Sequence, residues 1–283
     1  MNIQKWTVQA LAVLIVAGVV TACTEPATEG DEPPTQSESS RSRQETSGQS
    51  AIDRVLERGV LRVGTTGDWQ PMTYLDPDTD EYQGYYVDIV RDLAADMDVE
   101  IEWVRTTWQD KVSGIAAGRY DLTTGASFNL GRARQGAFTE PIAVVGTVPL
   151  TLTRDADRYD SWESINQDGV RVAATLGTTQ DEQAQRFFPN AELVRPDSGA
   201  RDYQEVIAGR ADVSITSNIE AGVLAERFEN LEIIDVEPRA TLPNGMIVDR
   251  GDVEWLNYVN AWITMKEYEG YFDQKAEEYG LSF

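Results

Sequence analysis

Residues 59–63 read Gly-Val-Leu-Arg-Val, and residues 169–172 repeat the pattern as Gly-Val-Arg-Val. A second pair follows in the same order, Gly-Arg-Tyr-Asp-Leu at 118–122 and Gly-Arg-Ala-Asp-Val at 209–213. Both segments of the first pair predict a strand. Both segments of the second pair predict the end of a helix that leads into a buried strand. Two patterns that recur in one order indicate two halves of similar architecture within one chain.

The sequence around the first repeat follows a β-α-β-α-β order, which is typical of an α/β layer with parallel strands. The expected strands are 60–65, 99–104 and 121–124, and the expected helices are 51–57, 85–97 and 108–117. Extended stretches at 144–153 and 242–248 are interpreted as paired crossings between the halves. We therefore predict two α/β lobes joined by a two-strand hinge. Lobe 1 comprises residues 51–147 and 242–283, and lobe 2 comprises residues 148–241.

Composition narrows the chemistry of the 283-residue chain. It has 24 Lys and Arg against 48 Asp and Glu, a net charge of −24, with no His and one Cys. This acid excess argues against a nucleic-acid partner, because phosphates are neutralised by clustered Lys and Arg. Without His there is no Ser-His or Cys-His nucleophile pair and no His metal site. One Cys cannot form an internal disulfide. We expect no metal and no cofactor.

The positive charges are also unevenly distributed, with 20 Arg and only four Lys. An acidic surface poor in Lys suits high ionic strength, where salt screens the repulsion between like charges. A halophilic or marine source explains this composition, and so does ordinary compositional drift.

The N-terminus has the pattern of a targeting segment. The apolar run from Ala10 to Val20 is too short to span a bilayer and fits a secretory signal. It ends in Val-Thr-Ala-Cys at 20–23, which resembles a lipoprotein signal. We expect residues 1–22 to be the signal peptide, Cys23 to carry lipid that holds the protein outside the cytoplasm on the cell membrane, and residues 23–50 to be a disordered tether. The alternative is an ordinary signal peptide with an incidental Cys.

Arg132 is the strongest candidate for contact with a ligand. It lies just beyond a predicted buried strand, with Ser127 a few residues before it. Ligands of α/β sheets bind outside the carboxyl ends of strands, and a guanidinium there can bind a carboxylate through two parallel hydrogen bonds. A surface salt bridge is the alternative for Arg132.

Three further segments point to the same strand edge. Thr178 and Thr179 follow Gly177 after a predicted strand and before a helix, so the helix start can attract an anion or can simply be capped by threonine. Two predicted strands of the first lobe are followed by tryptophans, one by Asp68-Trp69 and the other by Trp108. An indole ring there can stack on a ligand or pack between the lobes.

Four segments, at residues 60–71, 84–88, 118–121 and 129–132, together carry a family resemblance. Through them the chain resembles the family 3 extracytoplasmic solute-binding proteins, and among them the cyclohexadienyl dehydratase-like members. This resemblance implies a periplasmic-binding-protein type 2 fold, a monomer, and a cleft that closes around a small carboxylate. Arg132, Ser127 and Thr178 would hold the acid group, Trp69 and Trp108 would line the rest, and an ABC transporter permease would be the partner.

Two positions depart from the family pattern. Gln180 stands where the dehydratases have their catalytic Glu, and an amide cannot deliver a proton at a useful pKa. Ser217 stands where amino-acid binders have an Asp for the ligand ammonium, although Glu220 could replace it if it faces the cleft. We therefore expect a binding lipoprotein for a small organic acid or amino acid and assign no catalytic residue. The alternatives are a prephenate or arogenate dehydratase acting in the same cleft, and a ligand-sensing module.

Overall fold

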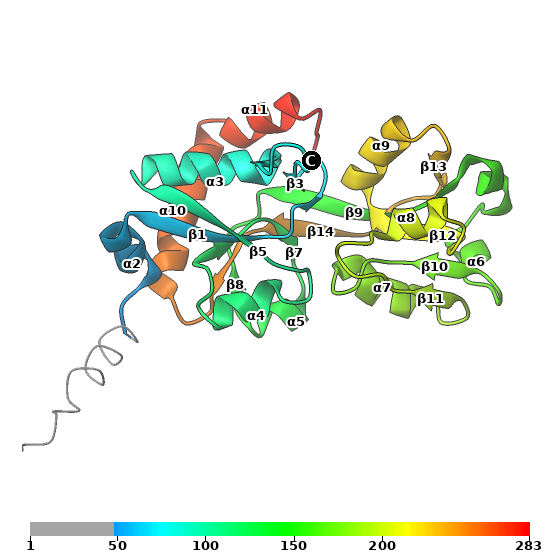
Figure 1. Ribbon diagram of the computed structural model, residues 1–283, viewed down its shortest axis with the longest axis horizontal. Coiled ribbons are helices and arrows are strands. Elements are labelled where there is room, and N and C mark those ends of the chain that lie inside the picture. Colours follow the sequence, from blue (N-terminus) through cyan, green and yellow to red (C-terminus); the bar gives the residue numbers. More distant parts are fainter. Residues whose placement is uncertain (1–47) are drawn as a thin grey trace, which may run out of the picture. The chain divides into compact units, whose positions relative to one another are not determined.

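The computed structural model describes residues 48–283 (Figure 1). The predicted signal peptide, Cys23 and nearly all of the tether lie outside the described residues. Within residues 48–283, no helix has the length and apolar character needed to cross a bilayer.

The first lobe is built around β1 (Val60–Thr65), which pairs in parallel with β5 (Glu100–Arg105) and β6 (Leu122–Thr123). Helix α2 (Ala51–Arg58) leads into β1 and ends at Gly59, whose φ of 68° is left-handed and suits glycine. The helices α3 (Tyr85–Asp96), α10 (Val253–Tyr268) and α11 (Tyr271–Glu278) contribute to one apolar core with the sheet. The C-terminal helices therefore complete the lobe that the N-terminal strand begins.

One predicted helix in this lobe is shorter than expected. The helix predicted at 108–117 is α4 (Lys111–Ala116), because residues 108–110 form a turn. The Thr107 hydroxyl donates to the Asp110 carboxylate at 3.1 Å, and the Asp110 N–H donates to Thr107 Oγ1 at 3.1 Å. These two hydrogen bonds stabilise the turn. Trp108 therefore lies before the helix and packs at the edge of the lobe.

The second lobe repeats the arrangement of the first. Its central strand β10 (Arg171–Ala173) pairs in parallel with β11 (Glu192–Val194) and β12 (Val213–Ser217). Strands of both lobes therefore follow the same spatial order, with the second strand, the first and then the third. The helices α7 (Thr179–Phe187), α8 (Asp202–Ile207) and α9 (Asn218–Arg227) pack on this sheet around separate apolar clusters.

Two long strands run side by side between these groups of elements (Figure 1). β9 (Ala143–Leu152) pairs antiparallel with β14 (Arg239–Gly245), and it also pairs with β12 of the second lobe. β14 in turn pairs with β7 (Ala126–Ser127) of the first lobe. The stretch expected at 242–248 is divided, because Met246 separates β14 from β15 (Ile247–Asp249), which turns to pair with β8 (Gly136–Phe138). We retain the lobe boundaries 51–147 with 242–283 and 148–241 as a proposal.

The remaining elements are short. They are β2 (Asp68–Trp69), β3 (Thr73–Leu75), β4 (Tyr82–Gln83), α5 (Leu130–Ala133), a 3₁₀ helix at Thr153–Arg158, α6 (Trp162–Ile165) and β13 (Leu231–Ile233).

The repeated sequence segments form the same contact in both lobes. In the first lobe Arg62 pairs with Asp121 at 3.0 Å, and in the second Arg171 pairs with Asp212 at 2.7 Å. In each case the backbone N–H of the arginine also donates to the aspartate, and the aspartate N–H donates back to the arginine carbonyl. This reciprocal contact joins the first and third strands of each sheet, which explains why both patterns recur together.

Candidate ligand-binding site

The two lobes meet around a small cavity of about 30 Å³. Eight of the nine residues predicted to touch a ligand line it, and Asp68 lies beside it. The first lobe contributes Trp69, Trp108, Ser127 and Arg132, and the second contributes Thr178, Thr179, Ser217 and Glu220. The cavity is small beside the usual size of a small-molecule site, so side chains or lobes would have to move apart to admit an amino acid or organic acid.

Arg132 is positioned by helix α5, whose first turn is capped by Asn129. The Asn129 side chain accepts hydrogen bonds from the N–H groups of Gly131 at 2.7 Å and Arg132 at 3.1 Å. The Arg132 guanidinium donates to Ser127 O at 3.1 Å, to Thr179 Oγ1 at 3.3 Å and to Gly177 O at 3.0 Å. It thus crosses from one lobe to the turn before α7 in the other.

The environment of Arg132 differs from that of a surface salt bridge. The residue is only 8% exposed, and within residues 48–283 it makes no ion pair with a carboxylate. Burial lowers the pKa of Arg132 to about 10, so the guanidinium remains charged at neutral pH. A buried cation whose hydrogen-bond partners are all neutral is a site that attracts an anion.

The turn at 177–179 combines close packing with helix capping. Thr178 Oγ1 accepts from Asp181 N at 3.1 Å and donates to Thr175 O at 2.6 Å, so the capping role considered for Thr178 is present. Gly177 has a φ of 81°, and a Cβ there would lie 2.7 Å from the backbone N of Gln109 in the first lobe. Only glycine therefore allows this approach of the two lobes.

Trp69 and Trp108 form one wall of the cavity. Their rings pack edge to face with centroids 5.9 Å apart. Trp69 Nε1 donates across the lobes to Ser217 Oγ at 3.1 Å, and Trp108 Nε1 donates to Asp68 Oδ1 at 3.0 Å. Behind this wall, Lys111 Nζ lies 4.5 Å from the Trp108 ring centroid, and burial lowers the pKa of Lys111 to about 7. The indoles thus pack between the lobes and line the cavity, and their stacking on a ligand stays a prediction.

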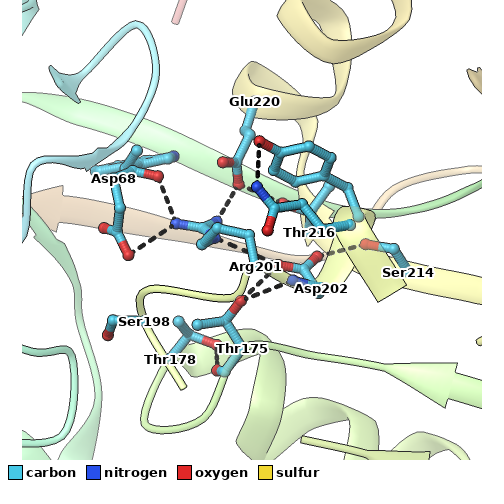
Figure 2. Close-up of polar contacts among 12 residues, drawn as sticks. Asp68, Thr175, Thr178, Ser198, Arg201, Asp202, Ser214, Thr216 and Glu220 are labelled. Carbon is cyan, nitrogen blue, oxygen red and sulfur yellow. Dashed lines mark hydrogen bonds and ion pairs between the residues drawn. The ribbon is translucent and has the colours of Figure 1, made fainter. Parts of the chain in front are cut away.

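Arg201 and Asp202, which were not predicted from the sequence, also line the cavity. Figure 2 shows their polar contacts. Arg201 Nη2 donates to Glu220 Oε2 at 2.5 Å, and Nη1 donates to Asp68 O at 2.6 Å. Both residues follow strand β11, so their position beyond a strand end in a parallel sheet was a usable signal. The loop between β11 and α8 has no apolar periodicity that would have predicted burial of an arginine.

Glu220 and Gln180 face the cavity, whereas Glu182 does not line it. Glu220 accepts from Thr216 Oγ1 at 2.6 Å and is 3% exposed. The pKa of Glu220 is raised to about 7, chiefly by burial and also by Asp202 and Asp68, against the opposing effects of Arg201 and of the Thr216 hydrogen bond. Glu182 instead accepts a hydrogen bond from the Asn129 side chain.

The raised pKa of Glu220 predicts a pH dependence of stability. Because folding favours its protonated form, this contribution to the free energy of unfolding is present below about pH 4.5 and is lost as the pH rises through about 7. We expect wild type to lose up to about 3 kcal/mol more than Glu220→Gln across this range. Urea unfolding of both proteins from about pH 5 to 7.5 measures the difference.

The chain has no His, so no imidazole titrates in the same pH range and adds to the difference between the two proteins. Lys111, with its lowered pKa, acts in the opposite sense and mainly above about pH 7. If the free energy of unfolding changes equally with pH in wild type and in Glu220→Gln, the raised pKa of Glu220 is contradicted.

Comparisons with known proteins identify the family and the fold of the chain. The chain matches the bacterial extracellular solute-binding proteins, family 3, over residues 61–282. It is 32% identical over 235 residues to cyclohexadienyl dehydratase of Pseudomonas aeruginosa, covering 82% of this chain and 86% of the relative.

Two solved structures are similar over nearly their whole length. One is an ancestral amino acid-binding protein, a precursor of cyclohexadienyl dehydratase, with 31% identity and a TM-score of 0.76 over 81% of this chain and 99% of that one. The other is an amino acid ABC transporter substrate-binding protein from Streptococcus pneumoniae bound to L-arginine, with 20% identity and a TM-score of 0.75 over 82% and 98%. The family resemblance and the bilobal type 2 fold predicted from the sequence are confirmed. The chain belongs to family 3 of the bacterial extracellular solute-binding proteins.

Proposed function

We propose that this protein captures a small carboxylate, an amino acid or a related organic acid, in the cavity between its lobes and delivers it to an ABC transporter. The observation that carries the proposal is the buried charge of Arg132, which has only neutral hydrogen-bond partners within residues 48–283. A ligand carboxylate would supply the missing negative charge and accept two parallel hydrogen bonds from the guanidinium.

Residues around Arg132 support the same orientation of a ligand. Its present acceptors include Ser127 O in the first lobe and Gly177 O in the second, so a carboxylate bound to this guanidinium would lie between the lobes. The paired strands β9 and β14 provide the connection about which the lobes would open to admit it. Ligand capture and lobe closure are then one event.

The nature of the rest of the ligand follows from Ser217. Its hydroxyl accepts from Trp69 Nε1 and from Glu220 N, and it carries no charge to offset a ligand ammonium. Glu220 already accepts from Arg201 and Thr216. These contacts favour a carboxylate with a weakly polar remainder over an ordinary α-amino acid.

A thermal-shift screen of amino acids and organic acids tests this function. A ligand at 100 times its dissociation constant should stabilise wild type by roughly 2.7 kcal/mol. Arg132→Ala should abolish the shift, because the carboxylate loses its counter-ion. Arg91→Ala, which removes an exposed guanidinium paired with Asp88 in the first lobe, is the control and should keep the shift. A shift that survives in Arg132→Ala would remove Arg132 from the site.

A second candidate function is prephenate or arogenate dehydration. It is favoured by the similarity to a cyclohexadienyl dehydratase and by Glu220, a carboxylic acid that lines the cavity and whose pKa is raised to about 7, mainly by burial. Such a group can donate a proton at neutral pH, which Gln180 cannot.

Incubation with prephenate, followed by assay of phenylpyruvate, separates the two functions. If the protein is a dehydratase that uses Glu220, Glu220→Gln should lower turnover by roughly 100-fold or more, whereas Gln180→Ala should not. Loss of turnover in Glu182→Ala alone would identify a different acid. No turnover by wild type at substrate concentrations that produce a thermal shift would leave binding as the function.

The membrane anchor is proposed from the sequence alone, on Cys23 and the segment before it. A lipidated monomer held outside the cytoplasm would remain close to a transporter permease. Cys23→Ser should move the protein from the membrane fraction to the soluble fraction on cell fractionation. A substituted protein that stays in the membrane fraction would contradict lipidation at Cys23.

A further inference from the structure

Arg201 enters the cavity from the second lobe and is surrounded by carboxylates (Figure 2). Its side chain is 8% exposed. The guanidinium lies 2.5 Å from Glu220, 3.4 Å from the Asp68 carboxylate and 3.5 Å from Asp202. One buried cation therefore faces three acidic side chains, one of them from the first lobe.

The two carboxylates of the second lobe are held independently of Arg201. Asp202 accepts from Thr175 Oγ1 at 2.6 Å and also from the Ser214 hydroxyl, and Glu220 accepts from Thr216 Oγ1 at 2.6 Å. Hydroxyl groups of β12 and of the loop after β10 thus hold both acids in place. The acids would remain as a receptor for a cation if the arginine side chain were removed.

Arg201 does not fill all the hydrogen-bonding positions that these carboxylates offer. Within residues 48–283, Arg201 Nε and Asp68 Oδ2 are buried and have no hydrogen-bond partner. Their ion-pair partners lie at 3.5 and 3.4 Å, with no hydrogen bond at either contact. The carboxylates therefore offer more acceptor capacity than the tethered guanidinium uses.

The Arg201 side chain also occupies space that a ligand could use. Arg201 and Glu220 line both the 30 Å³ cavity beside Arg132 and a neighbouring cavity of about 280 Å³. Shortening Arg201 would join the two cavities. The combined space would extend from the carboxylate-binding guanidinium of Arg132 to the three acids.

We propose that Arg201 is a tethered cation that fills the subsite for the positively charged part of a ligand, so that the site excludes cationic amino acids. This inference rests on the proposed function, because the ligand carboxylate is assigned to Arg132. The accepted ligands are then small carboxylates whose other end is uncharged or anionic.

Electrostatics support this exclusion. A ligand ammonium or guanidinium would need the carboxylates that Arg201 already holds, and it would meet a like charge in a buried site. Burial lowers the pKa of Arg201, but Glu220, Asp68 and Asp202 raise it by more, so the pKa lies above its usual value and the side chain stays charged. The positive charge of Arg201 therefore persists across the neutral pH range.

Arg201→Ala tests the proposal, with L-arginine, L-lysine and guanidinium chloride as probes in thermal-shift and calorimetric titrations. We expect wild type to show no binding of any probe up to the highest concentration used. Arg201→Ala should bind L-arginine with a dissociation constant at least ~30-fold below that concentration. At about 100 times the dissociation constant, L-arginine should raise the Tm of the variant by roughly 5–10 °C. Guanidinium ion alone should give a smaller rise, because it replaces the lost side-chain group without a carboxylate anchor.

Arg210→Ala is the matched control. It removes a second-lobe arginine from its carboxylate partner, Glu205, but Arg210 is mostly exposed and lies outside both cavities. It should gain no response to any probe. A response equal to that of Arg201→Ala would overturn the proposal, because it would show general binding of cations to an acidic protein.

Two further results would overturn the proposal. One is binding of L-arginine or L-lysine by wild type, in which Arg201 is in place. This test does not depend on the folding of a variant. The other is a folded Arg201→Ala that responds neither to guanidinium nor to L-arginine. If Arg201→Ala is unfolded, Arg201→Gln, whose amide can still donate to Glu220, is measured against the same expectation.

A double variant separates this inference from the proposed function. Arg132→Ala combined with Arg201→Ala should keep the response to guanidinium but lose the tight binding of L-arginine. If the double variant binds L-arginine as tightly as Arg201→Ala, Arg132 does not hold the carboxylate, and the proposed function fails while the cation subsite stands.

Discussion

A buried guanidinium that forms no ion pair with any carboxylate of residues 48–283 is the constraint around which the site is organised. Water cannot reach Arg132 freely, so its N–H groups need acceptors, and the structure supplies Ser127 O from the first lobe and Thr179 and Gly177 O from the second. These acceptors satisfy the hydrogen bonds but carry no charge, and Glu182 favours the charged guanidinium without forming an ion pair with it. The two lobes are therefore drawn together around a positive charge, and Gly177 is small enough to allow the approach.

The second lobe handles its buried cation in the opposite way. Arg201 faces Glu220, Asp68 and Asp202, so acidic groups exceed the positive charge there, and burial beside them raises the pKa of Glu220 to about 7. The site is thus polarised, with positive charge in excess at Arg132 and negative charge in excess around Arg201. A small carboxylate fits the first end, and the tethered cation decides what fits the second.

Much of this arrangement was predictable from the sequence, because it depends on local patterns. The repeats at 59–63 and 169–172 predicted two similar lobes, and Arg132 was found from its place after a strand. The helix at 108–117 and the stretch at 242–248 were drawn too long, since turn contacts at Asp110 and the change of strand partner at Met246 are tertiary features. Arg201 was missed because burial of a charged side chain depends on carboxylates that are distant in sequence, such as Asp68.

The central claim concerns where a ligand carboxylate binds. A crystal structure of the protein with the carboxylate that gives the largest thermal shift measures this directly. The account predicts carboxylate oxygens within hydrogen-bond distance of the Arg132 guanidinium, on the side that now donates to Gly177 O, with Arg201 still paired to Glu220. A ligand bound elsewhere, with Arg132 still bonded to Gly177 and Ser127, would contradict it.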